Sequence, residues 1–163
     1  MLLAEGLAAR KDALTQIRTL QDRIATAAVH LEDEKPNEDA RELQARLTQA
    51  LDDFESLSVR INRTNNEAVV AFDGERLTLM QAVARREKLL MAHKARKSVA
   101  DTIAPVSDRY GYHRKRTSKD DLRQVVTLDV KGERKAADDL AETVRRLDLA
   151  VQQVNWTTEM VEG

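Results

Sequence analysis

Residues 40–61, ARELQARLTQALDDFESLSVRI, are the stretch that decides the fold. Their apolar side chains recur every three or four positions, which is the period of a helix face that packs against a partner helix. Acidic residues lie at the start, where the helix dipole favours negative charge. We therefore expect a helix over about residues 38–62 with one unbroken seam: Ala40, Leu43, Leu47, Ala50, Phe54, Leu57 and Ile61.

A similar pattern precedes this stretch and predicts a helix over about residues 2–31. Polar residues, Arg10 and Gln21, occupy two of its seam positions. Pro36 cannot continue a helix, because it has no backbone N–H. The connection is short, so the two helices should run antiparallel. The apolar seam expected for the first helix is Leu3, Leu7, Leu14, Ile17, Ile24, Ala28 and Leu31.

Two further helices are expected, over about residues 78–104 and 130–155. Thr78 with Gln81 resembles a capping box that opens the third helix, and Pro105 should end it. Asp129 is a suitable N-cap for the fourth. The fourth helix has another regular seam: Ala137, Leu140, Val144, Leu147, Val151 and Val154.

The segments between these helices have other characters. Residues 69–77 contain Asp73-Gly74 between short apolar runs, which predicts a small β-hairpin with a type I′ turn. Residues 105–123 form a polar, basic loop, and about residues 124–128 should form a short strand. The chain as a whole, 1–163, is expected to be a single mainly α domain. Its two long helical hairpins should form an antiparallel four-helix, coiled-coil-like bundle.

Composition narrows the class of protein. Charged residues make up 34% of the chain and aromatic residues 3%, a balance typical of long solvated helices. The net charge is −5 over residues 1–84, +8 over 85–119 and −4 over 120–163. There is no cysteine, no export signal and no apolar run of membrane length. We expect a cytoplasmic protein that does not enter membranes.

A tetrad of the form hydrophobic-Asn-x-Thr occurs twice, each time where a seam ends. Two interpretations apply to the side chains around it. They can cap the helix ends while Trp156 plugs the end of the bundle, or they can form a pocket where Trp156 stacks on a planar ligand or a partner. This polar end cluster comprises Asn62, Arg63, Thr64, Asn65, Asn155, Trp156, Thr157, Thr158 and Glu159.

A basic segment covers residues 85–119 and contains interleaved tyrosines, a composition found in nucleic-acid or polyanion-binding strips. The alternative is that these cations pair with acidic residues inside the protein or across subunits. The candidate residues for polyanion binding are Arg85, Arg86, Lys94, Arg96, Lys97, Arg109, Tyr110, Tyr112, Arg114, Lys115 and Arg116.

Patterns typical of enzymes and of metal sites are missing from the sequence. The histidines, His30, His93 and His113, have no Glu or His at the helical spacing of a metal site. There is no glycine-rich phosphate loop, no Gly-x-Ser-x-Gly and no cysteine nucleophile. We expect no catalytic residues, no metal and no cofactor.

Polar residues at seam positions favour a homo-oligomer. Arg10, Gln21, Arg86 and His93 are awkward inside a thin monomeric bundle but natural at a helix interface that sets register. The leading interpretation is an oligomeric structural or scaffold protein. Polyanion binding through residues 85–119 is the alternative, and a ligand site at Trp156 is a weaker one.

Four motifs also occur in a family of small bacterial helical proteins that this chain resembles, some of which carry the label septicolysin. They are Ile61-Asn62-Arg63-Thr64-Asn65, Asp73-Gly74 with Leu77-Thr78, Leu128-Asp129-Val130 and Asn155-Trp156-Thr157-Thr158-Glu159. The resemblance spans about residues 2–160 and departs in the more basic loop 109–123. It implies a helical fold and supplies no catalytic residues. The label implies pore formation, whereas the sequence has no amphipathic strands of membrane length.

Overall fold

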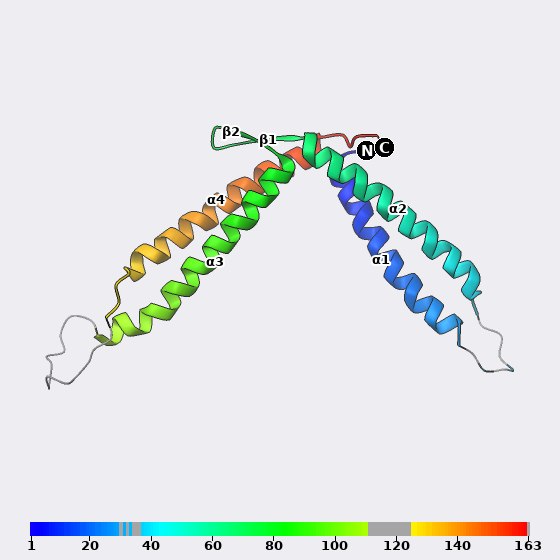
Figure 1. The fold of residues 1–163 in the computed structure, drawn as a ribbon, viewed down its shortest axis with the longest axis horizontal. Coiled ribbons are helices and arrows are strands. Elements are labelled where there is room, and N and C mark those ends of the chain that lie inside the picture. The colour runs from blue at the N-terminus through cyan, green and yellow to red at the C-terminus, as the bar shows by residue number, and fades with distance from the viewer. Residues whose placement is uncertain (30, 32, 34–36, 111–124, 163) are drawn as a thin grey trace. The chain divides into compact units, whose positions relative to one another are not determined.

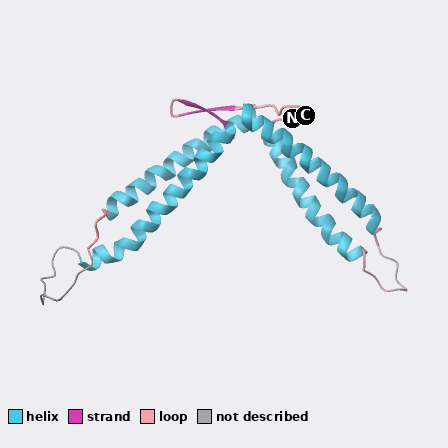
Figure 2. Ribbon diagram, in the orientation of Figure 1, coloured by secondary structure: helices cyan, strands magenta, loops and turns pink. Residues whose placement is uncertain are grey.

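In a computed structural model, the chain is described at all positions except 30, 32, 34–36, 111–124 and 163, with backbone alone at 108–110. The described residues form four helices and one two-stranded antiparallel sheet (Figures 1 and 2). The predicted fold class, mainly α with helical hairpins and a small β-hairpin, is confirmed. Two compact units divide the chain, Met1–Met80 with Gln152–Gly163 and Gln81–Val151. Each unit is described by itself below.

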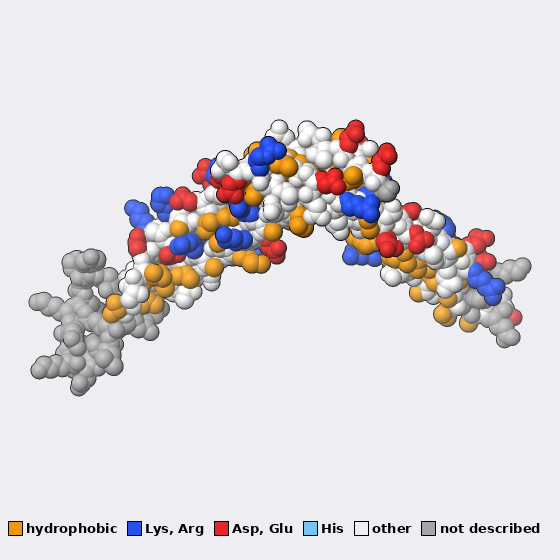
Figure 3. All heavy atoms as spheres, turned by 45° about the horizontal axis from the view of Figure 1, so that its top comes forward, with side chains coloured by type: hydrophobic (Ala, Val, Ile, Leu, Met, Phe, Trp, Pro, Cys, Tyr) orange, Lys and Arg blue, Asp and Glu red, His pale blue; other side chains and the backbone are white. Residues whose placement is uncertain are grey.

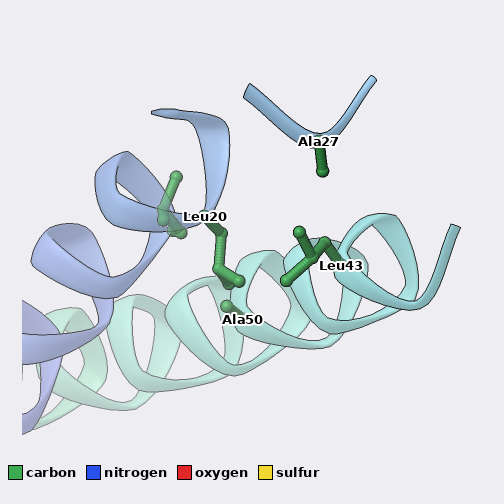
Figure 4. Close-up of a cluster of buried hydrophobic side chains, with 5 residues drawn as sticks. Leu20, Ala27, Leu43 and Ala50 are labelled. Carbon is green, nitrogen blue, oxygen red and sulfur yellow. The ribbon is translucent and has the colours of Figure 1, made fainter. Parts of the chain in front are cut away.

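The first unit is built on α1, Leu3–Ala27, and α2, Ala40–Glu67. These helices form an antiparallel hairpin, and Arg23 of α1 forms a salt bridge with Glu38 just before α2. Asp39 caps α2 by accepting a hydrogen bond from the Arg41 N–H at 2.7 Å. Buried side chains of both helices meet along the seam: Ile17, Leu20, Ala27, Leu43 and Ala50 (Figure 4).

The seam of α1 differs from the predicted one at every second position. The structure buries Leu20, whereas Gln21 is exposed and Leu14 is 38% exposed. Both phasings share positions 3, 10, 17 and 24 and alternate steps of three and four residues. Which of the two phasings forms the seam depends on the side of α1 that faces α2, and the sequence of α1 alone does not determine that side. The inner positions are Gly6, Ala13, Leu20 and Ala27, instead of Leu7, Leu14, Gln21 and Ala28.

The seam of α2 is confirmed, but the helix ends five residues later than predicted. It continues through Ile61 and the buried Thr64 to Glu67. The first Asn-x-Thr tetrad therefore lies inside the helix. The predicted cap of a helix end is therefore wrong for Asn62, which lies inside α2.

A small β-hairpin follows α2, as predicted. Strand β1, Val69–Phe72, pairs with β2, Glu75–Thr78, in a register that places Phe72 opposite Glu75. Asp73 and Gly74 have φ of 48° and 81°, which are the left-handed values of a type I′ turn. Val70, Phe72 and Leu77 are buried, so the hairpin adds an apolar face to the first unit.

The second unit holds most of α3, Leu79–Tyr110, and most of α4, Val130–Thr157, again as an antiparallel hairpin. Asp129 caps α4 as predicted, accepting from the N–H groups of Lys131 and Gly132 at 3.1 and 2.9 Å. Six residues of this unit are buried in the described part, four of them alanine: Ala82, Ala100, Ala104, Ala137, Val144 and Leu147.

Two predictions for the second unit are wrong. Helix α3 does not end before Pro105 but runs through it. A proline removes one backbone hydrogen bond, and the burial of Ala100 and Ala104 against the unit keeps the helix going. The strand expected at about 124–128 is not observed: residues 125–128 are in irregular structure.

Candidate functional site

Thr64 is the member of the predicted polar end cluster that the structure buries. Its side chain is 2% exposed. Its hydroxyl donates to the Arg60 carbonyl at 2.8 Å and accepts from the Val161 N–H at 3.1 Å. Arg60 also donates from Nε to the Val161 carbonyl at 3.1 Å. Thr64 of the first tetrad therefore binds the segment that follows the second tetrad.

The same C-terminal segment pairs with the start of the chain. Leu2 and Glu159 form an antiparallel bridge. The Leu3 N–H donates to the Thr158 carbonyl and the Met160 N–H to the Met1 carbonyl, both at 2.9 Å. We call residues 1–3 and 158–161, with their contacts to Thr64 and Arg60, the terminal clasp.

Met160 fixes the terminal clasp to α1. Its side chain is 5% exposed and lies against Gly6, where an added Cβ would stand 2.0 Å from the sulfur. Any larger residue at position 6 would displace the methionine. Sequence reasoning missed Met160, Arg60 and Gly6. A glycine inside a helix seam was the available signal, since glycine there costs helix stability and needs a packing reason.

Asn155 and Ser58 carry side-chain oxygens that are buried without a hydrogen-bond partner among the described residues. Such a group costs about 1–3 kcal/mol. Both residues belong to the first unit. The first unit therefore contains two polar side-chain oxygens that its described hydrogen bonds leave unsatisfied.

The remaining members of the cluster are more open. Thr157 bonds back to the Gln153 carbonyl of its own helix at 2.9 Å. Trp156 is 63% exposed, so the predicted plug at the end of the bundle is wrong. Asn65 and Thr158 are half-buried, while the exposed members are Asn62, Arg63, Thr157 and Glu159. The cluster thus joins the chain ends and does not enclose a pocket within the described residues.

Polar residues on the α3 seam find partners on α4 of the same chain. Arg86 forms a salt bridge with Asp148. His93 Nδ1 lies 2.8 Å from the Ala137 carbonyl, so this nitrogen carries the hydrogen and donates. A second subunit is therefore not needed to satisfy Arg86 and His93, which removes one argument for an oligomer.

Several candidates for polyanion binding are also engaged internally. Arg96 donates to both carboxylate oxygens of Glu133 at 3.0 and 2.9 Å, and Arg85 also has an interaction partner. Lys94 and Lys97 line a shallow groove of about 420 Å³ with Ser98, Asp101 and Thr102. The remaining candidates have side chains outside the described residues: Arg109, Tyr110, Tyr112, Arg114, Lys115 and Arg116.

Ion pairs also perturb titration in the first unit. The hydrogen bond from Arg23 lowers the pKa of the Glu38 carboxyl below its ordinary value, and Glu38 raises the pKa of Arg23. Across the described ranges, no three His, Cys, Asp or Glu side chains gather as metal ligands would. None of the helices, as far as they are described, is long and apolar enough to cross a membrane.

Each hairpin has one apolar flank beside its seam. In the first, Leu7, Leu14 and Leu51 each follow a seam residue by one position, and in antiparallel helices such positions lie on the same side. Leu14 is 38% and Leu51 47% exposed. Figure 3 shows rows of hydrophobic side chains along the hairpins. We call Leu7, Leu14 and Leu51 the α1–α2 flank.

The second hairpin has an uncharged flank on positions that each precede a seam residue. Val99 is 37% exposed, and its neighbours on this side are half-buried. A groove of about 390 Å³ adjoins it, lined by Ile103, Val106 and residues 125–128. The α3–α4 flank consists of Ala92, Val99, Val106, Ala136, Thr143 and Ala150.

Comparison with known protein families assigns the chain to one of them. A model of a family of unknown function, DUF6847, matches residues 10–160. The chain belongs to this family. The DUF6847 chain is also similar to a crystal structure described as a functionally unknown conserved protein from Corynebacterium diphtheriae. The two are 32% identical over 99% of each chain, with a TM-score of 0.77. No match was found among curated proteins.

These comparisons confirm the coarser part of the predicted resemblance, which is a helical family without an assigned activity. The septicolysin label does not occur in them. The function must therefore be argued from the surfaces and contacts of this chain.

Proposed function

We propose that this protein is a non-enzymatic, cytoplasmic structural protein that self-associates through its helical hairpins. The observation that carries the proposal is the α1–α2 flank, where Leu14 and Leu51 are 38% and 47% exposed beside a leucine-rich seam. Apolar residues next to a seam normally widen the buried face of a helix that has more than one neighbour. The first unit contains two long helices, α1 and α2, and within this unit Leu14 and Leu51 stay exposed.

Burial of the apolar flank would favour association of two copies. Burying a leucine side chain contributes about 1.5–3 kcal/mol. Leu7, Leu14 and Leu51 are already partly buried, so on each of two copies they contribute the exposed part of that figure. Together they offset part of the entropy cost of association, about 4–15 kcal/mol. Isolated exposed leucines are ordinary on protein surfaces. Here Leu7 and Leu14 are one heptad apart on α1 and Leu51 lies on the same side of α2, so together they form a surface suited to another helix.

The test is the mass of the protein in solution. At about 10 µM, light scattering after size exclusion should give at least twice the mass of the chain, and Leu14→Glu with Leu51→Glu should give one chain mass. The control, Gln16→Glu with Thr48→Glu, makes the same charge change at exposed positions outside the flank and should keep the wild-type mass. A wild-type protein of one chain mass would refute the proposal.

Polyanion binding is the second candidate, and one observation favours it. Lys94 and Lys97 form no ion pair within the described residues, and they line a groove with Ser98, Asp101 and Thr102, where two cations outnumber one carboxylate. Retention on a heparin column should fall with rising salt and weaken in Lys94→Ala with Lys97→Ala. Lys11→Ala with Arg18→Ala, on α1, is the control of equal charge. No retention of the wild type at about 50 mM salt rules this candidate out.

Within the described residues, no contact or surface supports the lytic activity that the septicolysin label implies. The indole of Trp156 is 63% exposed on the last turn of α4, which argues against a ligand site that encloses it.

A further inference from the structure

The two units of this chain carry opposite net charges. The first unit, Met1–Met80 with Gln152–Gly163, has 10 Lys and Arg against 17 Asp and Glu, a net charge of −7. The second, Gln81–Val151, has 17 against 11, a net charge of +6. The nearly neutral total of −1 therefore hides a strongly bipolar molecule. Surfaces of opposite charge attract, and like surfaces repel, when two copies meet.

This charge distribution selects among the ways in which two copies could associate. Pairing the first unit with the first unit of another copy would bring charges of −7 together. Pairing the second units would bring together charges of +6. Pairing the first unit of one copy with the second unit of another is the combination in which the charges are opposite. Each of these surfaces also has an apolar flank that another helix hairpin can cover.

We propose that the α1–α2 flank of one copy docks on the α3–α4 flank of a second copy. The inference rests on the proposed self-association and names its surfaces and its partner. In a two-fold pair the same contact forms twice, so each copy has both of its flanks covered. Such a pair is closed and has a discrete mass, whereas an unreciprocated contact would continue into a filament.

The side chains on the two flanks suit each other in size. The α1–α2 flank presents leucines, and the α3–α4 flank presents Ala92, Ala136, Ala150 and Thr143 around Val99. Large side chains of one helix pack into the spaces left by small ones on another. Two neighbours of the α3–α4 flank in the same heptad position are charged. Arg85 already has an interaction partner, and Asp129 accepts hydrogen bonds as the N-cap of α4. The flanks would therefore meet without burying a lone ion, while the opposite net charges of the two units favour the encounter.

Cross-linking tests the pairing directly, because the chain contains no cysteine. Leu51→Cys and Val99→Cys place one thiol on each flank, and Gln16→Cys places one on the opposite side of the α1–α2 hairpin. A short bismaleimide should join a Leu51→Cys chain to a Val99→Cys chain in an equimolar mixture. It should not join Leu51→Cys chains to each other. The control mixture of Gln16→Cys with Val99→Cys should give at most about one tenth of the product.

The outcomes separate this inference from the proposed function. Cross-linking of Leu51→Cys with itself, in a protein of dimeric mass, overturns the pairing of unlike flanks and leaves self-association intact. A dimer that gives no product in the Leu51→Cys and Val99→Cys mixture also overturns the pairing. A single chain mass for the wild type overturns both.

Salt provides an independent measurement. Raising sodium chloride from about 50 to about 500 mM shortens the screening length to less than half. The dissociation constant of the dimer, measured by sedimentation equilibrium in the analytical ultracentrifuge, should rise by about tenfold or more. A dissociation constant that is unchanged or lower in high salt would show that apolar contact alone holds the copies together and would overturn the role of opposite charge.

Discussion

The two hairpins of this protein solve the same packing problem with different residues. The seam of the α1–α2 hairpin buries branched side chains, among them Ile17, Leu20, Leu43 and Ile61. The described seam of the α3–α4 hairpin buries mostly alanine and relies on Leu147 and Val144 for bulk. A buried leucine contributes far more through the hydrophobic effect than a buried alanine. The second hairpin should therefore depend more on single large residues and on its polar cross-links.

The largest effect that would expose this difference is expected from Leu147→Ala. Leu147 is fully buried, so truncation should lower the free energy of unfolding by about 3 kcal/mol. Hydrogen exchange should show lost protection in α3 and α4 while α1 and α2 keep theirs. Leu149→Ala, two residues away on the same helix at 68% exposure, should change stability by less than about 0.5 kcal/mol. Equal loss of protection in both hairpins would contradict the comparison.

A second difference is the terminal clasp, which belongs to the first unit. Gly6→Ala would add a methyl 2.0 Å from the Met160 sulfur. Alanine improves helix propensity by about 1 kcal/mol, but the clash should leave a net loss of about 1–2 kcal/mol in thermal or urea unfolding. The Met160 amide should also exchange faster.

The double variant Gly6→Ala with Met160→Ala is the matched control for this contact. Alone, Met160→Ala removes packing and should destabilise, but in its presence the added methyl no longer meets sulfur. The two changes should therefore couple, with Gly6→Ala neutral or stabilising in the Met160→Ala background. Additive effects would show that Gly6 and Met160 do not interact as described.

Much of this architecture follows from the sequence. The α2 seam is regular over 22 residues from Ala40 to Ile61, and few other structures fit such a pattern. The Asp73-Gly74 turn and the Asp129 cap are short-range features whose chemistry lies in neighbouring residues. These elements could be predicted because residues close together in the sequence determine them.

The errors arise where the cause lies in another part of the chain. The α1 sequence allows two seam phasings, and the position of α2 selects the one with Leu20 inward. Trp156 was expected to fill the end of the bundle, but Met160, a few residues later, takes a buried position against Gly6. Thr64 could be nominated from its tetrad, whereas its bond to Val161 joins residues 97 positions apart. Contacts of that separation leave no periodic trace in the sequence.

A third, smaller effect concerns the cross-link in the second hairpin. Arg86 and Asp148 pair beside the seam, with side chains 43% and 32% exposed. Asp148→Asn should therefore destabilise α3–α4 by about 1 kcal/mol, near the upper end for partly exposed pairs. Asp139→Asn, which removes the more exposed pair with Lys135 on α4 itself, is the control and should have a smaller effect. Equal shifts in the melting temperature of the two variants would show that the Arg86 pair is an ordinary surface pair.

The smallest expected effect is the corresponding ion pair in the first hairpin, between Arg23 and Glu38. Arg23 lowers the pKa of Glu38, so the pair stabilises the folded state above the ordinary glutamate value of about 4.3. Between the two pKa values the unfolded chain binds more protons than the folded one, so that contribution decreases as the pH falls and is lost below the lower, folded-state pKa. Carbon-detected NMR titration of the Glu38 carboxyl should show the lowered midpoint, and Arg23→Gln should raise that midpoint toward the ordinary value. An unchanged midpoint in Arg23→Gln would mean that the α1–α2 hairpin is held by its leucine seam without help from this pair.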